Sequence, residues 1–336
     1  MPDDLRPGTP WRLLALPPLP AAVIEQLFGG PGVELVLPAE RTQGAVHALL
    51  PGVDLVLGDW SHALRVDDPG PRVCFVQQPS VGVDDIDVEA CTSAGVPVAN
   101  TAGANATSVA EWCLSAVLAL LRRTVEADAA VRRGEWPQLE LGGRELAGKR
   151  VGVIGMGDIG RRVATLFGAL GCPVSYWSRR EHPDAPATYR PLAELVADSE
   201  ILVVVIALAA ETRGLVDAAL LAAAAPGMLL VNAARGAVID EPALVDALRD
   251  GRLGGAALDV FTVEPLPADS PLRSLPGVLL SPHMAGSATE AGLRILGASR
   301  DNLLRVLGGQ APVSVVNAGE GVPVVPTRRG IPDAPG

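Results

Sequence analysis

Three glycines at fixed spacing are the feature of this sequence that points most directly to chemistry. Gly155, Gly157 and Gly160 form G-x-G-x-x-G within residues 151–160, after an apolar run that is typical of a buried strand, and residues 161–170 show a helical pattern. The first glycine permits the tight turn, the second lets the backbone approach a pyrophosphate, and the third lets helix and strand pack closely. N–H groups at the helix start attract the phosphate charge. A bare motif of this kind is often only a turn, but here strand, turn and helix follow in the order that dinucleotide binding requires.

The residues about 20 positions after such a turn select the cofactor. A second apolar run, residues 173–177, ends at Ser178-Arg179-Arg180, where an NAD-binding fold usually has an Asp or Glu that holds the ribose 2′-hydroxyl. A hydroxyl followed by two guanidinium groups suits a 2′-phosphate, through charge-assisted and often bidentate hydrogen bonds. A solvated arginine pair is the alternative interpretation, and Glu181 lies close by. The pattern favours NADP(H), with NAD(H) as the alternative cofactor.

Polar side chains also follow three later strands of the predicted sheet. Arg235 comes just past one strand, and His283 comes directly after another. Asp259 lies near the end of the strand between them, and Glu264 lies in the turn that follows this strand. Because ligands of open α/β sheets bind outside the carboxyl ends of the strands, we expect Arg235, Glu264 and His283 to converge. Taken singly, each has another explanation: a surface charge, an acidic strand edge or a structural histidine. Together they can supply a proton, orient its donor and hold an anion.

The composition restricts the class of protein. Of the 336 residues, 49% are hydrophobic, and the mean hydropathy is +0.31, which suffices for the cores of two domains. The net charge of −11, without a Lys/Arg-rich tract, argues against a nucleic-acid partner, because phosphate binding needs a basic surface. The N-terminus shows no basic and apolar leader, and the most apolar run, residues 201–210, is too short to span a bilayer. We therefore expect a cytoplasmic protein that does not contact membranes.

The cysteines are scattered and show no C-x-x-C spacing; they are Cys74, Cys91, Cys113 and Cys172. No paired histidines accompany them. We expect small apolar fillers in a reducing compartment, and neither a disulfide framework nor a metal site.

Alternating strands and helices predict an α/β fold with two parallel sheets flanked by helices. The predicted strands are residues 12–16, 33–37, 54–57, 72–76 and 96–99 in a first series, and residues 150–154, 173–177, 201–206, 228–231, 255–260 and 278–280 in a second. The predicted helices are residues 21–28, 85–94, 108–121, 125–133, 161–170, 241–250 and 289–307. The end of the chain, residues 318–336, is rich in glycine and proline, which predicts a mobile tail.

With these segments in this order, residues 13–317 resemble a D-2-hydroxyacid dehydrogenase. Besides the glycine turn and the three strand-end segments, the matching stretches are Ser80-Val-Gly-Val-Asp-Asp-Ile-Asp87, Asn100-Thr-Ala-Gly-Ala-Asn105, Val109-Ala-Glu111 and Glu211-Thr-Arg-Gly214. The resemblance implies a flavodoxin-like substrate domain of residues 1–104 and 285–317 around a Rossmann-type cofactor domain of residues 105–284. It also implies a homodimer, with contacts from the region of residues 108–121.

The resemblance, read with the residue chemistry, assigns roles in moving a hydride to a 2-keto carbon while a proton reaches its oxygen. His283 would donate that proton, and Glu264 would favour the imidazolium form and fix the ring's orientation. Arg235 would hold the substrate's carboxylate and keto oxygen. Backbone N–H groups of Val81 and Gly82 would bind the remaining carboxylate oxygen.

The same resemblance assigns the cofactor contacts. Asp259 would accept a hydrogen bond from the nicotinamide carboxamide, and the amides of Asp158 and Ile159 would bind the pyrophosphate. Thr107 is a further cofactor candidate. Trp136 is expected either to border the substrate pocket or to pack at an interface.

Departures from the family pattern bear on the cofactor wall and the substrate. Residues 207–210 read Ala-Leu-Ala-Ala where many members have Leu-Pro-Leu-Thr, so a wall of the cofactor site is expected to differ. Met284 replaces a commoner isoleucine, a volume-tolerant change. Gln78 stands where phosphoglycerate dehydrogenases place an arginine, which argues against a phosphorylated substrate.

The Ser-Arg-Arg segment resembles NADPH-dependent glyoxylate and hydroxypyruvate reductases, which predicts reduction of a small 2-keto acid of D configuration. A hydroxyphenylpyruvate-type substrate stays open. The alternatives are a nucleotide-sensing binding protein of the same fold, like the family's corepressors, and oxidation of formate or phosphite.

Overall fold

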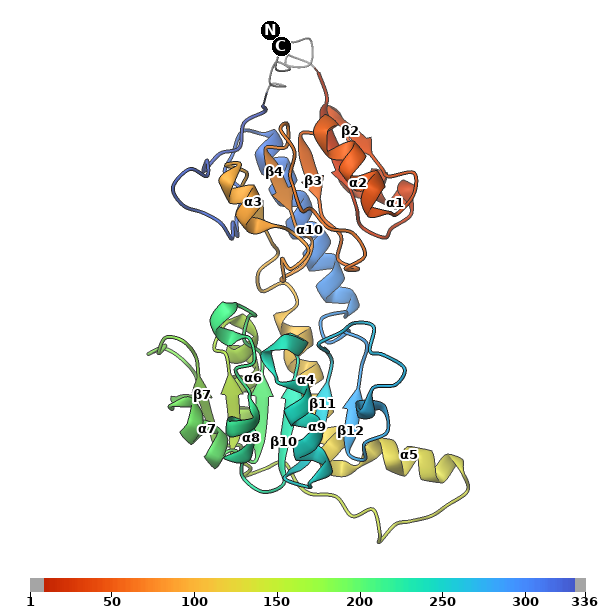
Figure 1. The fold of residues 1–336 in the computed structure, drawn as a ribbon, viewed down its shortest axis with the longest axis vertical. Helices are drawn as coiled ribbons and strands as arrows, with labels where there is room; N and C mark the ends of the chain where they lie inside the picture. The colour runs from red at the N-terminus through yellow and green to blue at the C-terminus, as the bar shows by residue number, and fades with distance from the viewer. Residues whose placement is uncertain (1–8, 330–336) are drawn as a thin grey trace. The chain divides into compact units, whose positions relative to one another are not determined.

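The structure is a computed structural model, and it describes residues 9–329. These residues form two compact units (Figure 1). One unit contains the described residues up to Asn105 and those from Thr289 onward, and the other contains Ala106 to Ala288. The chain therefore passes from one unit to the other twice, and the first unit is built from both ends of the sequence.

The first unit is a five-stranded parallel sheet in the order β2-β1-β3-β4-β5. This is the doubly wound, flavodoxin-like strand order that the sequence predicts. Its strands are β1 (Trp11–Ala15), β2 (Val33–Val36), β3 (Leu55–Leu57), β4 (Phe75–Gln77) and β5 (Val98–Ala99). Its helices are α1 (Ala21–Phe28), α2 (Gln43–Leu49), α3 (Val88–Ser93) and α10 (Thr289–Leu307).

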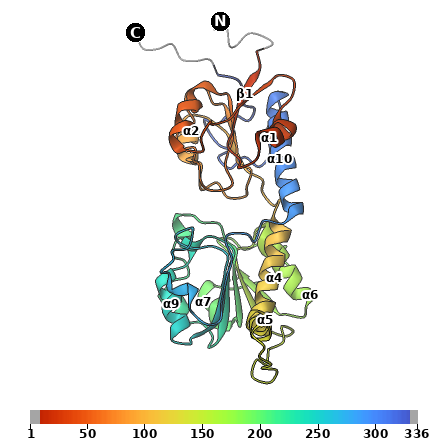
Figure 2. The ribbon, with the colours of Figure 1, turned by 90° about the vertical axis from the view of Figure 1, so that its right-hand side faces the viewer.

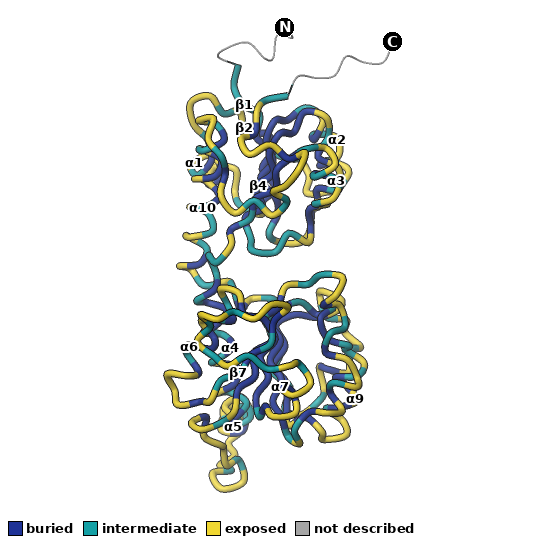
Figure 3. Tube along the Cα trace, turned by 90° about the vertical axis from the view of Figure 1, so that its left-hand side faces the viewer, coloured by how far each residue is buried: buried dark blue, intermediate teal, exposed yellow. Residues whose placement is uncertain are grey.

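Two apolar clusters cover the faces of this sheet. Ile24 and Phe28 of α1 pack with Leu303 and Val306 of α10 on one face, and Figure 2 shows these two helices side by side. On the other face, α2 and α3 cover the alternate strand residues. The strand cores of each unit are almost wholly buried (Figure 3).

The second unit is a seven-stranded parallel sheet in the order β12-β11-β10-β9-β6-β7-β8, a Rossmann-type arrangement. Its strands are β6 (Val151–Ile154), β7 (Val174–Trp177), β8 (Thr188–Tyr189), β9 (Ile201–Val204), β10 (Met228–Asn232), β11 (Leu253–Leu258) and β12 (Val278–Leu280). Its helices are α4 (Ala106–Arg122), α5 (Thr124–Arg132), α6 (Asp158–Ala169), α7 (Leu192–Asp198), α8 (Ala218–Ala222) and α9 (Glu241–Arg249).

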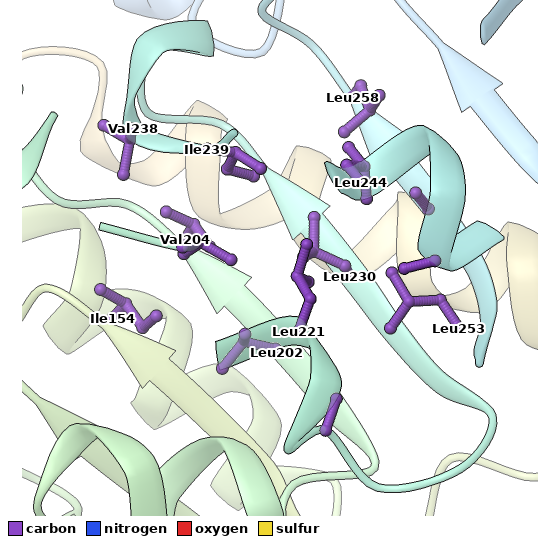
Figure 4. Packing of buried hydrophobic residues seen from close by; sticks show 14 of the residues in the cluster. Ile154, Leu202, Val204, Leu221, Leu230, Val238, Ile239, Leu244, Leu253 and Leu258 are labelled. Atoms are coloured by element: carbon purple, nitrogen blue, oxygen red, sulfur yellow. The ribbon is translucent and has the colours of Figure 1, made fainter. Parts of the chain in front are cut away.

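Helices cover both faces of this second sheet. Alternate strand residues such as Leu202, Leu230 and Leu258 pack under α7, α8 and α9 (Figure 4). Their neighbours along the strands, among them Val203 and Val231, pack under α4 and α6. Because every strand runs in the same direction, the carboxyl ends of all seven lie along one edge of the sheet.

The fold class and the eleven strands predicted from the sequence are confirmed, with boundary shifts. The helix predicted from residue 85 begins only at Val88, because the Asp87 side chain caps it by accepting from the Ala90 N–H. The pattern missed the short elements α2, α7, α8 and β8. Each has seven residues or fewer, too few to show a clear periodicity.

The chain end from residue 318, expected to be mobile, is held to the first unit up to residue 329. Arg328 donates to Asp54 at 2.9 Å and lies over the Trp11 ring at 4.8 Å. Asp54 is wholly buried and also accepts from Arg72 at 2.8 Å and from the Arg12 N–H at 2.8 Å. Burial alone would raise the pKa of Asp54, but these hydrogen bonds hold it below its ordinary value.

All four cysteines are buried and unpaired with one another. Burial raises the pKa of the Cys74 and Cys91 thiols to about 12, so neither is a nucleophile near neutral pH. Within residues 9–329, no helix is long and apolar enough to cross a bilayer. Over the same range, no three His, Cys, Asp or Glu side chains are grouped to hold a metal ion.

Candidate active site

The glycine turn connects β6 to α6 with almost no spare space. Gly155 has φ +104°, and a Cβ there would lie 2.8 Å from the Ile206 Cα. A Cβ on Gly160 would lie 2.0 Å from the Gly155 carbonyl oxygen, so the third glycine is required for the helix to approach the strand. At Gly157 a Cβ would meet nothing within 4 Å, so the space beside this glycine is open.

This open space fits a pyrophosphate. Asp158 and Ile159 lie in the first turn of the twelve-residue helix α6. The N–H groups of a first turn have no carbonyl partner within the helix. A bound phosphate would accept from them and lie at the positive end of the helix dipole. Thr107, the other predicted cofactor contact, lies half-buried in the first turn of α4 in the same unit.

The carboxyl ends of β6, β7 and β9 lie level with one another, since Ile154 pairs with Trp177 on one side and with Val204 on the other. The segment after β7 carries the predicted selectivity residues. Ser178 is buried and its hydroxyl donates to the Arg180 carbonyl at 2.5 Å. Arg179 and Arg180 are exposed. The buried serine thus shapes a turn that presents two guanidinium groups to solvent.

The loop after β9 contains the departure at residues 207–210. Ile206, two residues after β9, is the residue that a Cβ on Gly155 would approach most closely. Further along, Thr212 is wholly buried, and its hydroxyl donates to the Ala207 carbonyl at 2.8 Å and accepts from the Ala209 N–H at 2.7 Å. Thr212 therefore fixes the shape of this loop, which has Leu208 where the family pattern described above has a proline.

The second group of predicted residues follows β10, β11 and β12, which are neighbours in the sheet. Their last residues, Asn232, Leu258 and Leu280, pair in register, so the three loops start side by side. His283 Nδ1 lies 2.8 Å from Glu264 Oε2. The other oxygen of Glu264, Oε1, accepts from the Phe261 N–H at 2.9 Å. Both carboxylate oxygens are engaged, and the ring of His283 is oriented through Nδ1.

Asp259 holds the loop that carries His283. This carboxylate is 1% exposed; Oδ1 accepts from the Ser281 hydroxyl at 2.6 Å and from the Met284 N–H at 2.8 Å. Oδ2 accepts from the Ala285 N–H at 2.8 Å. His283 itself has φ +52°, a left-handed conformation that a non-glycine residue adopts only under tertiary constraint. Asp259 supplies that constraint with hydrogen bonds to three residues around His283.

Arg235 follows β10 and immediately precedes a buried glycine. The Asn232 side chain fixes this turn by accepting from the Ala234 N–H at 3.1 Å and donating to the Arg235 carbonyl at 3.2 Å. A Cβ on Gly236 would lie 1.9 Å from the Phe261 carbonyl carbon. The backbone next to Arg235 therefore touches the backbone that donates to Glu264. Sequence reasoning assigned no role to Gly236, which follows Arg235 directly, or to Asn232, which lies three residues before it.

The predicted substrate amides belong to the first unit, in the loop after β4. Asn100 donates to the Val81 carbonyl at 2.7 Å, and the Ser80 hydroxyl donates to the Gly82 carbonyl at 2.6 Å. Gln78 is buried and donates to the Asp59 carbonyl at 2.9 Å, so it shapes the loop from inside the fold.

The sequence reasoning missed a further ionisable pair in the first unit, His62 and Asp85. The His62 Nδ1 lies 2.5 Å from Asp85 Oδ2, and His62 has φ +61°. The two residues are 23 positions apart, so no local pattern could have paired them.

Comparisons with known proteins identify the family of the chain. Residues 114–285 match the model for the D-isomer specific 2-hydroxyacid dehydrogenase, NAD binding domain. A glyoxylate reductase from Aeropyrum pernix is 42% identical over 258 residues, which are 74% of this chain and 77% of that protein. A D-3-phosphoglycerate dehydrogenase from Mycobacterium leprae is 38% identical over 256 residues, 75% of this chain but only 48% of that protein.

Among solved structures, a glyoxylate reductase from Paecilomyes thermophila superposes with a TM-score of 0.83 at 27% identity, covering 91% of this chain and 98% of that one. The family match covers half of the chain, and the two-sheet fold agrees with it. The chain belongs to the D-isomer specific 2-hydroxyacid dehydrogenases, a family of NAD(P)-dependent enzymes.

Proposed function

We propose that this enzyme reduces a small 2-keto acid to the D-2-hydroxy acid with NADPH, with glyoxylate and hydroxypyruvate as the first substrates to test. The observation that carries the proposal is the 2.8 Å pair of His283 and Glu264 at the sheet edge that also presents Arg235. A proton donor, the group that orients it and an anion-binding cation follow three adjacent strands. This set matches the needs of keto-acid reduction.

His283 acts as the general acid in this proposal. Its Nδ1 donates to Glu264, so Nε2 is the nitrogen that delivers a proton to the keto oxygen as negative charge develops there. A positioned acid of this kind contributes about 10²–10⁴-fold to the rate. The carboxylate of Glu264 fixes the ring and stabilises the imidazolium before reaction. The nicotinamide of bound NADPH supplies the hydride.

Arg235 binds the substrate in this proposal. Its guanidinium pairs with the substrate carboxylate and holds the keto carbon in place for transfer. We assign the amides of Val81 and Gly82 to the second carboxylate oxygen. The bonds from Asn100 and Ser80 to the carbonyls of this loop support that role, because they fix the loop backbone without using those amides.

The cofactor assignment favours NADP(H), with NAD(H) as the alternative. It is supported by the two exposed guanidinium groups after β7, where a carboxylate would favour NAD. A phosphorylated substrate is disfavoured, because the buried Gln78 offers no charge at the position where an arginine would bind phosphate. The 42% identical glyoxylate reductase supports a small unphosphorylated acid.

We propose that a second copy of the chain covers α5 and the loop after it. Large apolar side chains are exposed there: Val125 and Val131 on α5, then Trp136 at 79% and Leu139 at 90%. A cluster of this kind marks a protein interface. Sedimentation of the wild type and of Trp136→Ser tests it: a wild-type monomer at micromolar concentration would contradict the assignment.

The test of the reaction is NADPH consumption by the purified chain with glyoxylate, hydroxypyruvate, pyruvate and phenylpyruvate, and with NADH in parallel. Turnover that falls about 10²-fold or more in His283→Ala supports the enzyme assignment. Turnover with NADH but not with NADPH would overturn the cofactor assignment. It would leave the assignment of His283 as the general acid unchanged. Dinucleotide binding without any His283-dependent turnover would contradict the reaction.

A further inference from the structure

An ion pair joins two loops across the carboxyl end of β6. Arg179, from the loop after β7, donates to Glu211, from the loop after β9, with Nη1 and Oε1 2.5 Å apart. Since β6 lies between β7 and β9, the pair spans the strand that leads into the glycine turn at Gly155. Any dinucleotide whose pyrophosphate lies on that turn has its adenosine ribose near the end of β7. Arg179 is therefore engaged by the protein's own carboxylate at the place where a 2′-phosphate would need it.

The fold does not require this ion pair. The side chains of Arg179 and Glu211 are 54% and 57% exposed, and an exposed pair contributes little to stability. The loop after β9 is instead fixed by Thr212, which is wholly buried and hydrogen-bonded to Ala207 and Ala209. Glu211 can leave Arg179 without disturbing the loop. Its backbone N–H and Arg179 hold the pKa of Glu211 below its ordinary value, so it is ionised at neutral pH.

We propose that Glu211 sets the cofactor preference by competing with the 2′-phosphate of NADP(H) for Arg179. This inference rests on the proposed cofactor site. NADH carries a neutral 2′-hydroxyl and leaves the ion pair intact. NADPH adds about 1.5–2 negative charges close to Glu211, as phosphate monoesters do. The 2′-phosphate must therefore displace the Glu211 carboxylate from Arg179. The displaced carboxylate still lies close to the phosphate and repels it. Glu211 thus weakens NADPH binding selectively, and Arg180 remains as the second cation of the loop.

The alternative role for Glu211 makes the opposite prediction. If the carboxylate served to position Arg179 for the phosphate, its removal would weaken NADPH binding. Competition predicts that its removal strengthens NADPH binding. The sign of one measurement therefore separates the two roles, and Glu211→Gln keeps the side chain's shape while it removes the charge.

The test is isothermal titration calorimetry of the full chain with NADPH and NADH at low ionic strength, in the wild type and in Glu211→Gln. We expect the ratio of the NADH to the NADPH dissociation constant to rise by about fivefold, the upper range for an exposed ion pair. Adenosine 2′,5′-bisphosphate, which lacks the nicotinamide, should show the same gain. The control is Asp246→Asn on α9, which removes the acid of another exposed pair, with Arg249, outside these loops; its ratio should stay at the wild-type value.

An unchanged or lowered ratio in Glu211→Gln would overturn the inference, as would an equal rise in the control. In an Arg179→Gln background the effect of Glu211→Gln should shrink, because Arg179, the cation for which Glu211 and the 2′-phosphate compete, is absent. A wild type that prefers NADH would contradict the proposed NADPH preference, yet the shift of the ratio would still decide the role of Glu211. A wild type that binds neither dinucleotide would refute both proposals.

Discussion

Replacing Gly236 with alanine should disable the active site without touching any reacting atom. A Cβ at this position would lie 1.9 Å from the Phe261 carbonyl carbon and 2.3 Å from the Thr262 nitrogen. Both neighbours are backbone, so no side chain can rotate away. To restore the 3.0 Å that real Cβ atoms keep, the segment with Arg235 must separate from the segment leading to Glu264.

The expected magnitude follows from that separation. A shift of about 1 Å in the relative position of reacting groups can cost about 10²-fold in rate. Overpacking of a buried position costs about 1–3 kcal/mol in the free energy of unfolding. We therefore expect Gly236→Ala to remain folded, with kcat/KM for the keto acid reduced about 10²-fold. NADPH affinity should stay near the wild-type value, because the glycine turn follows β6, which β9 separates from β10.

Steady-state kinetics, urea unfolding and calorimetric titration of NADPH measure these three quantities. Gly168→Ala is the matched control, since Gly168 is exposed on α6 and a Cβ there meets nothing within 4 Å. This control should gain about 0.5–1 kcal/mol from helix propensity and keep its activity. The reasoning is refuted if Gly236→Ala retains kcat/KM within about twofold of the wild type.

Three further changes test other parts of the structure. Gly160→Ala should abolish NADPH binding in calorimetry, because its Cβ would lie 2.0 Å from a carbonyl oxygen at the base of the pyrophosphate turn; wild-type affinity would contradict the assignment of this turn. Glu264→Gln should lower kcat about 10- to 100-fold, the range for a hydrogen bond to a charged group. A loss confined to KM would show that the carboxylate acts on binding alone. Arg328→Gln should lower the free energy of unfolding at pH 7 by about 1–3 kcal/mol, because Asp54 loses one of its donors in a buried site. Since the pKa of Asp54 is held below its ordinary value, the stability that its charge provides is present at neutral pH and lost in acid. The difference between this variant and the wild type in chemical denaturation should therefore narrow as the pH falls below about 4, and a constant difference would count against the role of the Asp54 charge.

The shared location of three predicted site residues of the second unit could be predicted from the sequence because parallel strands share a direction. Once Arg235, Glu264 and His283 were each located after a strand, they had to lie on one edge of the sheet. What could not be predicted is which groups these residues would contact. The Arg179–Glu211 pair joins residues 32 positions apart, and no local pattern specifies it. Strand order was needed to show that β6 lies beneath the pair.

A second limit of sequence reasoning was the assignment of one role to each residue. Asp259 was predicted from the resemblance to accept from the cofactor. The structure shows its two oxygens accepting from Ser281, Met284 and Ala285, the residues around His283. Donors on the main chain are invisible in a sequence, because every residue except proline carries one. The positioning function of a buried carboxylate therefore appears only when its partners have coordinates.

These contacts link the residues of the proposed active site into one continuous framework. Asp259 holds the loop of His283, whose Nδ1 lies against Glu264, and Glu264 in turn accepts from the Phe261 N–H. The backbone around Phe261 then touches Gly236, next to Arg235. Each link is either a hydrogen bond of 2.8–2.9 Å or a backbone contact that admits no Cβ. A change at Asp259 or Gly236 should therefore reduce kcat as a change in His283 does, although neither residue is needed as an acid, because the rate depends on where the imidazole and the guanidinium are held.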